Sequence, residues 1–308
     1  MPAAKGKHRL QLPYGRLTIK KHPEVRLELK ERLARALPPM LRHIPRDKKW
    51  LYPFFLAGNI VLREEERRLD ALPGAFDGYA VAYASDIHFG AYLDARAAVS
   101  LCERLTALRA DLILLGGDYG EDQEQAIAFF NAIPSFPAGA PVLAALGNHD
   151  YPEGGKTMEP LLRAMREKNV QPLVNQTRVF RQGDDSLAVC VPDDFRCGKP
   201  DFQALKEQSD GARFVLLSTH SPDLLPDAAE AGLRFDLALC GHTHGGQVAL
   251  FGRSLLSSSI YGNRFRAGWY RAFGAEIFVS CGAGTSILPM RLGTRSEIHR
   301  LVLRVNKG

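Results

Sequence analysis

From Gly78 onward the chain alternates short apolar runs with stretches of helical periodicity, and this alternation constrains the fold more than any other feature. Runs that are apolar on both faces predict strands buried from both sides, so helices must cover at least one sheet. The helical stretches are Asp94–Arg109, Glu121–Ile133, Met158–Lys168 and Leu224–Gly232. The expected strands are Tyr79–Ser85, Asp111–Gly117, Pro141–Gly147, Ser186–Val191, Arg213–Thr219, Asp236–Gly241, Glu276–Gly282 and Glu297–Val305. The pattern predicts an α/β fold.

Residues 1–77 do not follow this alternation, and we expect them to be a basic and aromatic extension of a catalytic domain at 78–308. Residues 1–50 carry 14 Lys and Arg against 4 Asp and Glu, so the rest of the chain carries 26 against 30. The basic and aromatic stretch Lys48–Phe55 suits either contact with an anionic membrane surface or packing across the main domain. Ile60–Leu69 is compatible with an edge strand or a helix.

The cysteines and the first residues bear on the compartment. Five scattered cysteines without a CxxC pair predict neither a disulfide framework nor a zinc ribbon, which favours a reducing compartment. The first residues are polar and basic, unlike a secretory signal peptide. The apolar run Trp50–Leu62 is shorter than the roughly 20 residues that a membrane span needs. We expect a cytoplasmic protein, with peripheral contact at the inner face of the membrane as the open alternative.

Polar side chains gather where the apolar runs end. Five of the nine histidines lie there, together with carboxylates and an asparagine. In α/β folds the loops at the carboxyl ends of strands carry ligands. Carboxylate, amide and imidazole ligands together suit divalent Mn, Fe or Zn, with manganese among the candidates. The residues are Asp86, His88, Asp118, Asn148, His149, Asp150, His220, His242 and His244.

Seven of these residues are candidate metal ligands, which is more than one closed tetrahedral site needs. Two adjacent open sites sharing a bridging carboxylate would use them all. The glycines around "HTH", Gly241 and Gly245-Gly246, permit a turn that directs His242 and His244 toward different ions. The seven candidates are Asp86, His88, Asp118, Asn148, His220, His242 and His244.

The pieces "DIH", "GGD", "GNHD", "TH" and "GHTH" stand in this order between Asp86 and His244. This ordered set resembles the signature of the calcineurin-like metallophosphoesterase superfamily. The stretches "SDIHFG", "GNHDYPEG", "GHTHGGQ" and "GTSILPMRLGTRSEI" are similar to one bacterial branch, the phosphodiesterases of the YkuE and YaeI type. The resemblance covers about three quarters of the chain, from Gly78 onward, and implies a four-layer α/β/β/α sandwich.

The resemblance also implies a role for each residue in a dinuclear centre that hydrolyses phosphoesters. His149 would lie beside the scissile phosphate as a catalytic residue oriented by Asp150, and Asp118 would bridge two divalent ions. One ion would be held by Asp86, His88, Asp118 and His244, and the other by Asp118, Asn148, His220 and His242.

The substrate depends on the loops around this centre. The basic and aromatic segment at 251–271 supplies four candidate substrate-binding residues, Tyr261, Arg264, Arg266 and Trp269. With the basic extension, they suggest a lipid-linked phosphoester, and by analogy with the superfamily the pyrophosphate of UDP-diacylglucosamine in lipid A synthesis. The alternatives are a general soluble phosphodiesterase or nucleotide phosphatase, and a non-catalytic scaffold of the same fold. The acidic balance of the catalytic part weighs against a stable nucleic-acid partner.

Overall fold

The computed structural model describes most of the chain beyond residue 59. The described residues are 60–90, 93–250, 253–254, 258–286 and 291–306, with the backbone of two short strands near the start. Those two strands, β1 (Arg9–Gln11) and β2 (Arg16–Thr18), pair antiparallel. The basic and aromatic stretch at 48–55 lies outside the described residues.

The first of two large sheets has six strands in the order β3-β16-β4-β5-β6-β7. The strands β4, β5, β6 and β7 pair in parallel, β16 runs antiparallel to β4, and β3 pairs parallel to β16 at the edge. Their bounds are β3 Val61–Leu69, β4 Ala80–Ala84, β5 Leu112–Leu115, β6 Val142–Ala144, β7 Gln171–Pro172 and β16 Glu297–Val305.

The second large sheet has the order β14-β15-β11-β10-β9-β8. Its four central strands are parallel, and both edge strands, β8 and β14, pair antiparallel with their neighbours. A separate small sheet joins β12 (Ala249–Leu250) to β13 (Arg253–Ser254). The bounds in the large sheet are β8 Gln176–Gln182, β9 Asp185–Val191, β10 Phe214–Ser218, β11 Leu237–Cys240, β14 Gly268–Ala272 and β15 Ala275–Val279.

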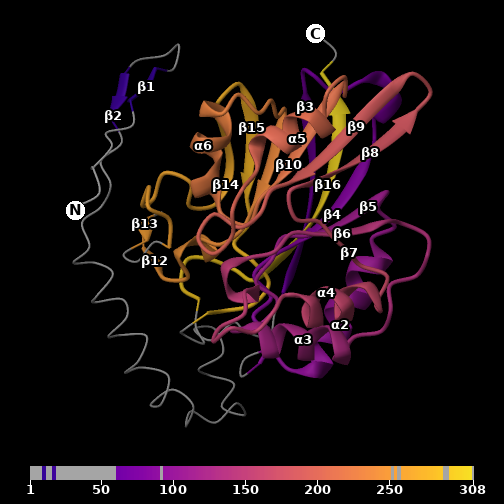
Figure 1. The fold of residues 1–308 in the computed structure, drawn as a ribbon, viewed down its shortest axis with the longest axis vertical. Coiled ribbons are helices and arrows are strands. Elements are labelled where there is room, and N and C mark those ends of the chain that lie inside the picture. Colours follow the sequence, from indigo (N-terminus) through magenta and orange to yellow (C-terminus); the bar gives the residue numbers. More distant parts are fainter. Residues whose placement is uncertain are drawn as a thin grey trace.

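Side-chain alternation along the strands produces four layers (Figure 1). In β4, Ala80, Ala82 and Ala84 pack in one core with the helices of the first sheet, whereas Val81 and Tyr83 pack in a second core shared with the other sheet. A third core lies between the second sheet and its helices. The helices are α2 Ala95–Ala107, α3 Gln123–Ala132 and α4 Glu159–Arg166 on the first sheet, and α5 Phe202–Gln208 and α6 Leu225–Glu230 on the second.

The expected α/β/β/α sandwich is therefore confirmed, and all eight apolar runs form strands. The sequence did not predict the half-exposed edge strands β8 and β14 or the short helix α5, because these segments lack a strong apolar period. The ambiguous segment Ile60–Leu69 forms the edge strand β3. This part of residues 1–77 consequently belongs to the first sheet.

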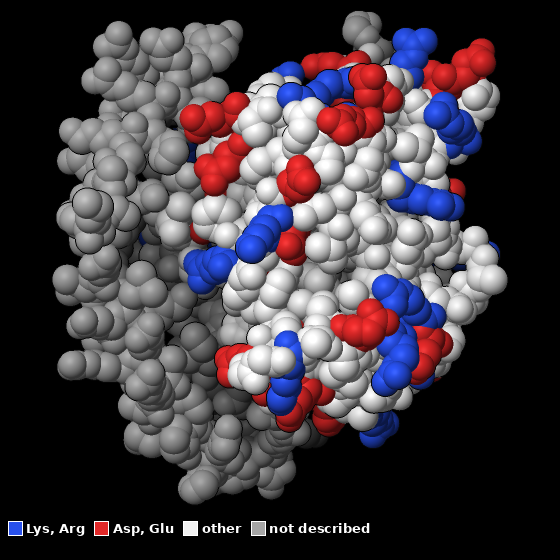
Figure 2. Space-filling view, in the orientation of Figure 1, with Lys and Arg blue, Asp and Glu red and all other residues white. Residues whose placement is uncertain are grey.

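Strand β3 also contacts the second sheet at the open edge of the sandwich. Arg67 of β3 forms an ion pair with Glu276 of β15, and its guanidinium lies 4.5 Å from the centre of the Trp269 ring. The Trp269 indole donates to Glu65 at 2.7 Å. On the face shown in Figure 2, acidic and basic side chains are interspersed over the described part of the molecule.

Candidate metal centre

The candidate ligands follow the carboxyl ends of parallel strands in both sheets. Asp86 and His88 follow β4, Asp118 follows β5 and Asn148 follows β6 in the first sheet. His220 follows β10, and His242 and His244 follow β11, in the second sheet. Because both sets of parallel strands end at the same side of the sandwich, the six carboxylate and histidine candidates meet across the two sheets, and Asn148 directly precedes His149, whose backbone N–H donates to Asp118.

Two clusters of possible ligand atoms form there. One contains Asp86, His88 and His244, and the other contains Asp118, His220 and His242, with the atoms of each cluster within 4.8 Å of one another. We call them the first and the second ligand group. Asp118 also lies near the first group, because its Oδ2 is 3.6 Å from His88 Nε2 and 3.0 Å from His220 Nε2. Asp118 is thus placed where a bridging carboxylate would lie.

Direct hydrogen bonds tie the ligand loops of the two sheets together. The His242 backbone N–H donates to Asp86 Oδ1 at 2.8 Å. The His220 Nδ1 lies 2.8 Å from the Gly116 carbonyl, which leaves its Nε2 facing Asp118. A ligand histidine whose second nitrogen is held by a carbonyl has a defined tautomer and orientation.

The backbone at the ligands is unusual. Five of the seven candidates have φ between 47° and 66°, in the left-handed region that residues other than glycine seldom adopt. Such conformations persist at functional sites when the surrounding structure enforces them, at about 1–3 kcal/mol each. The five residues are Asp86, His88, Asp118, His242 and His244.

Two glycines allow the loops to approach one another. A Cβ on Gly241 would overlap the Asp86 carboxylate and Ser85, and a Cβ on Gly147 would overlap the Asp118 carboxylate. The glycine at each position is therefore required by the close approach of the neighbouring loop. The glycines of "GHTH" and "GNHD" let a carboxylate from a neighbouring loop lie directly against the backbone.

The second group is negatively charged at its centre. Burial raises the pKa of Asp118, but His220, His149 and His88 outweigh it and hold that pKa well below its usual range. Burial lowers the pKa of His220, but the adjacent Asp118 carboxylate raises it to about 10. A buried carboxylate that stays anionic among imidazoles is the ligand type that a divalent cation requires.

In the first group the pKa shifts run in the opposite direction, with the pKa of the carboxylate raised and that of His244 lowered. Burial raises the pKa of Asp86, and burial together with the charges of His88 and Arg291 holds the pKa of His244 well below its usual range. His244 is thus a neutral imidazole with a lone pair to offer. His88 Nε2 and His244 Nε2 lie 3.1 Å apart, so both ring nitrogens face one position.

Arg291 supports this group and was not singled out by the sequence analysis. Its side chain is 1% exposed, and its guanidinium donates to the carbonyls of His244 at 3.1 Å and Cys281 at 2.7 Å. It also donates from Nε to Gly284 at 3.2 Å, and the Gly284 N–H in turn donates to the Asp86 carbonyl at 2.7 Å. Arg291 therefore joins the His244 loop to the turn that holds Asp86. The available signal was its place in "PMRLG", inside a stretch quoted for the family resemblance.

His149 is half-buried, whereas the four histidines of the two ligand groups are buried. Its backbone N–H donates to Asp118 Oδ1 at 2.9 Å, and its ring lies edge-on to His88 with the ring centres 5.1 Å apart. Its Nδ1 lies 2.8 Å from the Glu121 carbonyl. This contact makes Nδ1 the donor and leaves Nε2 for a substrate.

Asp150 does not orient His149, and that part of the prediction is wrong. Its carboxylate accepts the backbone N–H groups of Gly147, Asp118 and Tyr119, at 2.8 to 2.9 Å. Burial and the Asp118 charge raise the pKa of Asp150 to about 7. The short 3₁₀ turn at Asn148–Asp150 directs the Asp150 side chain back into the loop, so it holds the Asp118 backbone, and the Glu121 carbonyl holds His149.

The donors fit a pair of divalent cations. The Asn148 side-chain oxygen is buried and has no hydrogen-bond partner among the described residues, as an unshared ligand atom would. The mixture of nitrogen and oxygen donors matches Mn, Fe or Zn. Asn148 would complete the second group, and Asp118 would touch both ions.

The four candidate substrate residues do not form one surface. Tyr261 and Arg264 lie against Phe265, with the Tyr261 and Phe265 ring centres 6.2 Å apart and the Arg264 guanidinium 5.4 Å from the Phe265 ring. Arg266 and Trp269 instead line a cavity at the open edge of the sandwich. Trp269 is engaged there by Glu65 and Arg67.

This fold and centre define a metal-dependent phosphoester hydrolase. The calcineurin-like phosphoesterase family matches residues 79–246, more than half of the chain, and the chain belongs to that family. The metallophosphoesterase YkuE of Bacillus subtilis (strain 168) is 26% identical over 238 residues, which cover 76% of this chain and 82% of YkuE. The phosphodiesterase YaeI of Escherichia coli (strain K12) is 30% identical over 234 residues, 73% of this chain and 82% of YaeI.

Among solved structures, the sulfate thiohydrolase SoxB of Thermus thermophilus is similar, with 16% identity and a TM-score of 0.45. The match covers 76% of this chain and 57% of SoxB. Among the described residues, no helix combines the length and the apolarity that a membrane-spanning segment requires.

Proposed function

We propose that this hydrolase is a phosphodiesterase or pyrophosphohydrolase that uses two divalent ions, with Mn²⁺ as the first ion to test. The observation that carries the proposal is the meeting of the two ligand groups at Asp118, with the half-buried His149 beside them. When bound, two such ions polarise a phosphoryl group and lower the pKa of water.

The protein groups would divide the remaining work. Asp118 brings negative charge to the point where both groups meet, and Asp150 fixes the Asp118 backbone through two N–H bonds to residues 118 and 119. His149 would donate from Nε2 to the departing oxygen in its doubly protonated form, in which Nδ1–H stays bonded to the Glu121 carbonyl and Nε2 carries the proton that is transferred. Gly147 and Gly241 keep these loops close enough for the groups to act together.

A small set of chromogenic esters tests the proposal. We expect hydrolysis of bis(p-nitrophenyl) phosphate with Mn²⁺, slower hydrolysis of p-nitrophenyl phosphate, and loss of both rates when a chelator is added. The His149→Ala protein should bind metal normally but lose most of the rate. Equal rates in His149→Ala and wild type would remove His149 from the mechanism, and faster monoester hydrolysis would make the enzyme a phosphatase.

The organic part of the substrate needs a second panel. The support for a lipid-linked substrate is the basic and aromatic N-terminal sequence, and the support for a nucleotide is the general chemistry of the centre. The lipid-linked and the nucleotide substrate are distinguished by assaying UDP-diacylglucosamine, a dinucleotide pyrophosphate and a cyclic nucleotide.

The membrane proposal is tested by flotation with anionic vesicles, with and without residues 1–59. Equal flotation of both proteins would refute it.

A further inference from the structure

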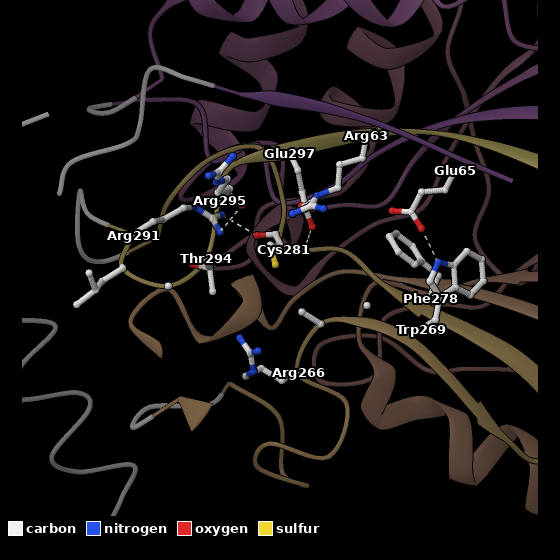
Figure 3. Close-up of a pocket in the computed structure, with 14 residues that line it drawn as sticks. Arg63, Glu65, Arg266, Trp269, Phe278, Cys281, Arg291, Thr294, Arg295 and Glu297 are labelled. Carbon is white, nitrogen blue, oxygen red and sulfur yellow. Dashed lines mark hydrogen bonds and ion pairs between the residues drawn. The ribbon is translucent and has the colours of Figure 1, made fainter. Parts of the chain in front are cut away.

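A cavity of about 560 Å³ lies at the open edge of the sandwich, between the edge strands β3 and β14 and the segment that follows residue 290 (Figure 3). Four arginines and two glutamates line it. Figure 3 shows Arg266 on one wall and Arg63, Arg291 and Arg295 on the other. The cavity is separate from the two ligand groups, which supply none of its described lining.

The carboxylates of this cavity are already engaged. Glu297 pairs with Arg63 at 2.5 Å and accepts the Cys281 N–H at 2.9 Å. Glu65 accepts the Trp269 indole N–H at 2.7 Å. Arg63 therefore offsets the charge of Glu297, while Glu65 keeps its charge and is oriented by Trp269, so the four arginines exceed the two glutamates of the lining by two charges.

Three guanidinium groups remain without a carboxylate partner among the described residues: Arg266, Arg291 and Arg295. Arg291 is buried and donates only to carbonyls and toward the His244 ring, so it forms no ion pair, and the Asp86 and Glu297 carboxylates act on it only from farther away. Arg266 donates to the Gly245 carbonyl at 2.7 Å, and the exposed Arg295 side chain makes no hydrogen bond or ion pair with a described residue. Buried positive charge of this kind is costly unless an anion balances it.

We propose that this cavity is a second ligand site, which binds a phosphate group between Arg266 and Arg295 with Arg291 behind them. Planar guanidinium groups bind tetrahedral oxyanions through paired N–H donors. The aromatic ring of Trp269 forms one wall, and its contacts with the Arg67 guanidinium, 4.5 Å from the ring centre, and with the Phe278 ring hold it in place.

The site is in contact with the back of the metal loop. Arg266 holds the Gly245 carbonyl and Arg291 holds the His244 carbonyl, while Cys281 and Thr294 pack directly against Gly245. Binding of an anion to the same arginines would therefore be linked to the position of His244. The linkage is reciprocal, so metal at the first group should also change phosphate affinity.

Calorimetric titration of the full-length, metal-loaded protein with inorganic phosphate tests the proposal. We expect two binding events in the wild type, one at the metal centre and one in the cavity. Arg295→Gln should weaken the cavity event by about tenfold or more, as expected when one charge-assisted contact is lost, and leave the metal event intact. Arg266→Gln should act in the same direction.

Arg181→Gln is the matched control, because Arg181 is exposed like Arg295, belongs to the edge strand β8 and does not line the cavity. Asp118→Asn should remove phosphate binding at the metal centre and keep phosphate binding in the cavity. The titration therefore distinguishes a failure of the catalytic proposal from a failure of the second site. Because Arg295 is exposed, its substitution should not unfold the protein, and thermal melting checks this. A single binding event in the wild type, or unchanged binding in both Arg295→Gln and Arg266→Gln, would overturn the second site.

The source of the phosphate is decided by kinetics with two substrates. If the phosphate belongs to the substrate, Arg295→Gln raises the KM for a pyrophosphate diester but not for bis(p-nitrophenyl) phosphate; this arm rests on the proposed function. If the cavity takes free phosphate, neither KM changes, and the substitution alters only the phosphate titration.

Discussion

The two ligand groups use the same residue types but differ in their surroundings. The first group, Asp86, His88 and His244, is backed by the buried cation Arg291. The second group, Asp118, His220 and His242, contains a carboxylate that three neighbouring imidazoles, His220, His149 and His88, keep anionic. A cation should therefore bind more firmly at the second group, because positive charge behind a site opposes a metal ion and an anionic centre favours it.

The largest expected effect comes from removing the residue that the two groups share. Asp118→Asn should lose both ions and slow hydrolysis on the order of a thousandfold, because several kcal/mol of charge stabilisation depend on the bound ions. Metal analysis and initial rates measure this. Asp184→Asn, in an exposed hairpin turn, is the control and should change neither. Full metal content and full rate in Asp118→Asn would rule out the bridging position.

The next effect separates the two groups. His244→Ala and His220→Ala should each retain one of two ions and lose roughly a hundredfold in rate. The ion that remains in His244→Ala should be the more tightly held, because the second group is intact there. Competition with a chelator measures both affinities. Equal retention in the two variants would show that the surroundings of the groups do not matter.

Substitution of Arg291 tests the support of the first group alone. Arg291→Lys keeps the charge but reaches fewer carbonyls, so the first group should bind metal about tenfold more weakly while the second group is unchanged. The measurement is a two-site metal titration, with thermal melting to exclude unfolding. Arg271→Lys, an exposed arginine paired with Asp70, serves as the control. Equal weakening at both groups would indicate a general loss of structure.

Acidification should release the two ions in order. Burial raises the pKa of Asp86, so this carboxylate becomes protonated at a higher pH than an ordinary aspartate. Despite burial, the histidines around Asp118 lower its pKa, so Asp118 stays anionic to a lower pH. The two carboxylates therefore predict that the first group loses its ion first as the pH falls, which stepwise dialysis and metal analysis would detect; His220, whose pKa of about 10 favours its protonated form, acts in the opposite direction at the second group. Release of both ions in one step would contradict the comparison.

The smallest effect concerns Glu121. Its carboxylate lies 3.4 Å from His88 Nδ1, while its backbone carbonyl holds His149. Glu121→Gln removes the charge but keeps the carbonyl, so metal affinity at the first group should fall by about threefold and His149 should keep its orientation. Glu124→Gln, on the exposed side of α3, is the matched control. A large loss of rate at saturating metal would mean that the side chain also acts on the substrate.

Much of the fold could be read from the sequence because the information is local. Strands such as β4 and β10 are short apolar runs, and their buried faces alternate with period two. The edge strands β8 and β14 were missed because one side of each faces solvent and the pattern is mixed. Asp150 was misassigned because its adjacency to His149 in "GNHD" says nothing about the direction of a side chain in a 3₁₀ turn.

The sequence by itself determined the chemical types of the ligands and their location at strand ends, since both follow from residue identity and strand length. Only the tertiary structure decided which of them meet. His242 lies two residues from His244 yet joins His220 and Asp118, and Arg291 reaches His244 from 47 positions away. These contacts depend on two sheets stacked face to face, and sheet stacking is set by the shared core between them, which no single segment encodes.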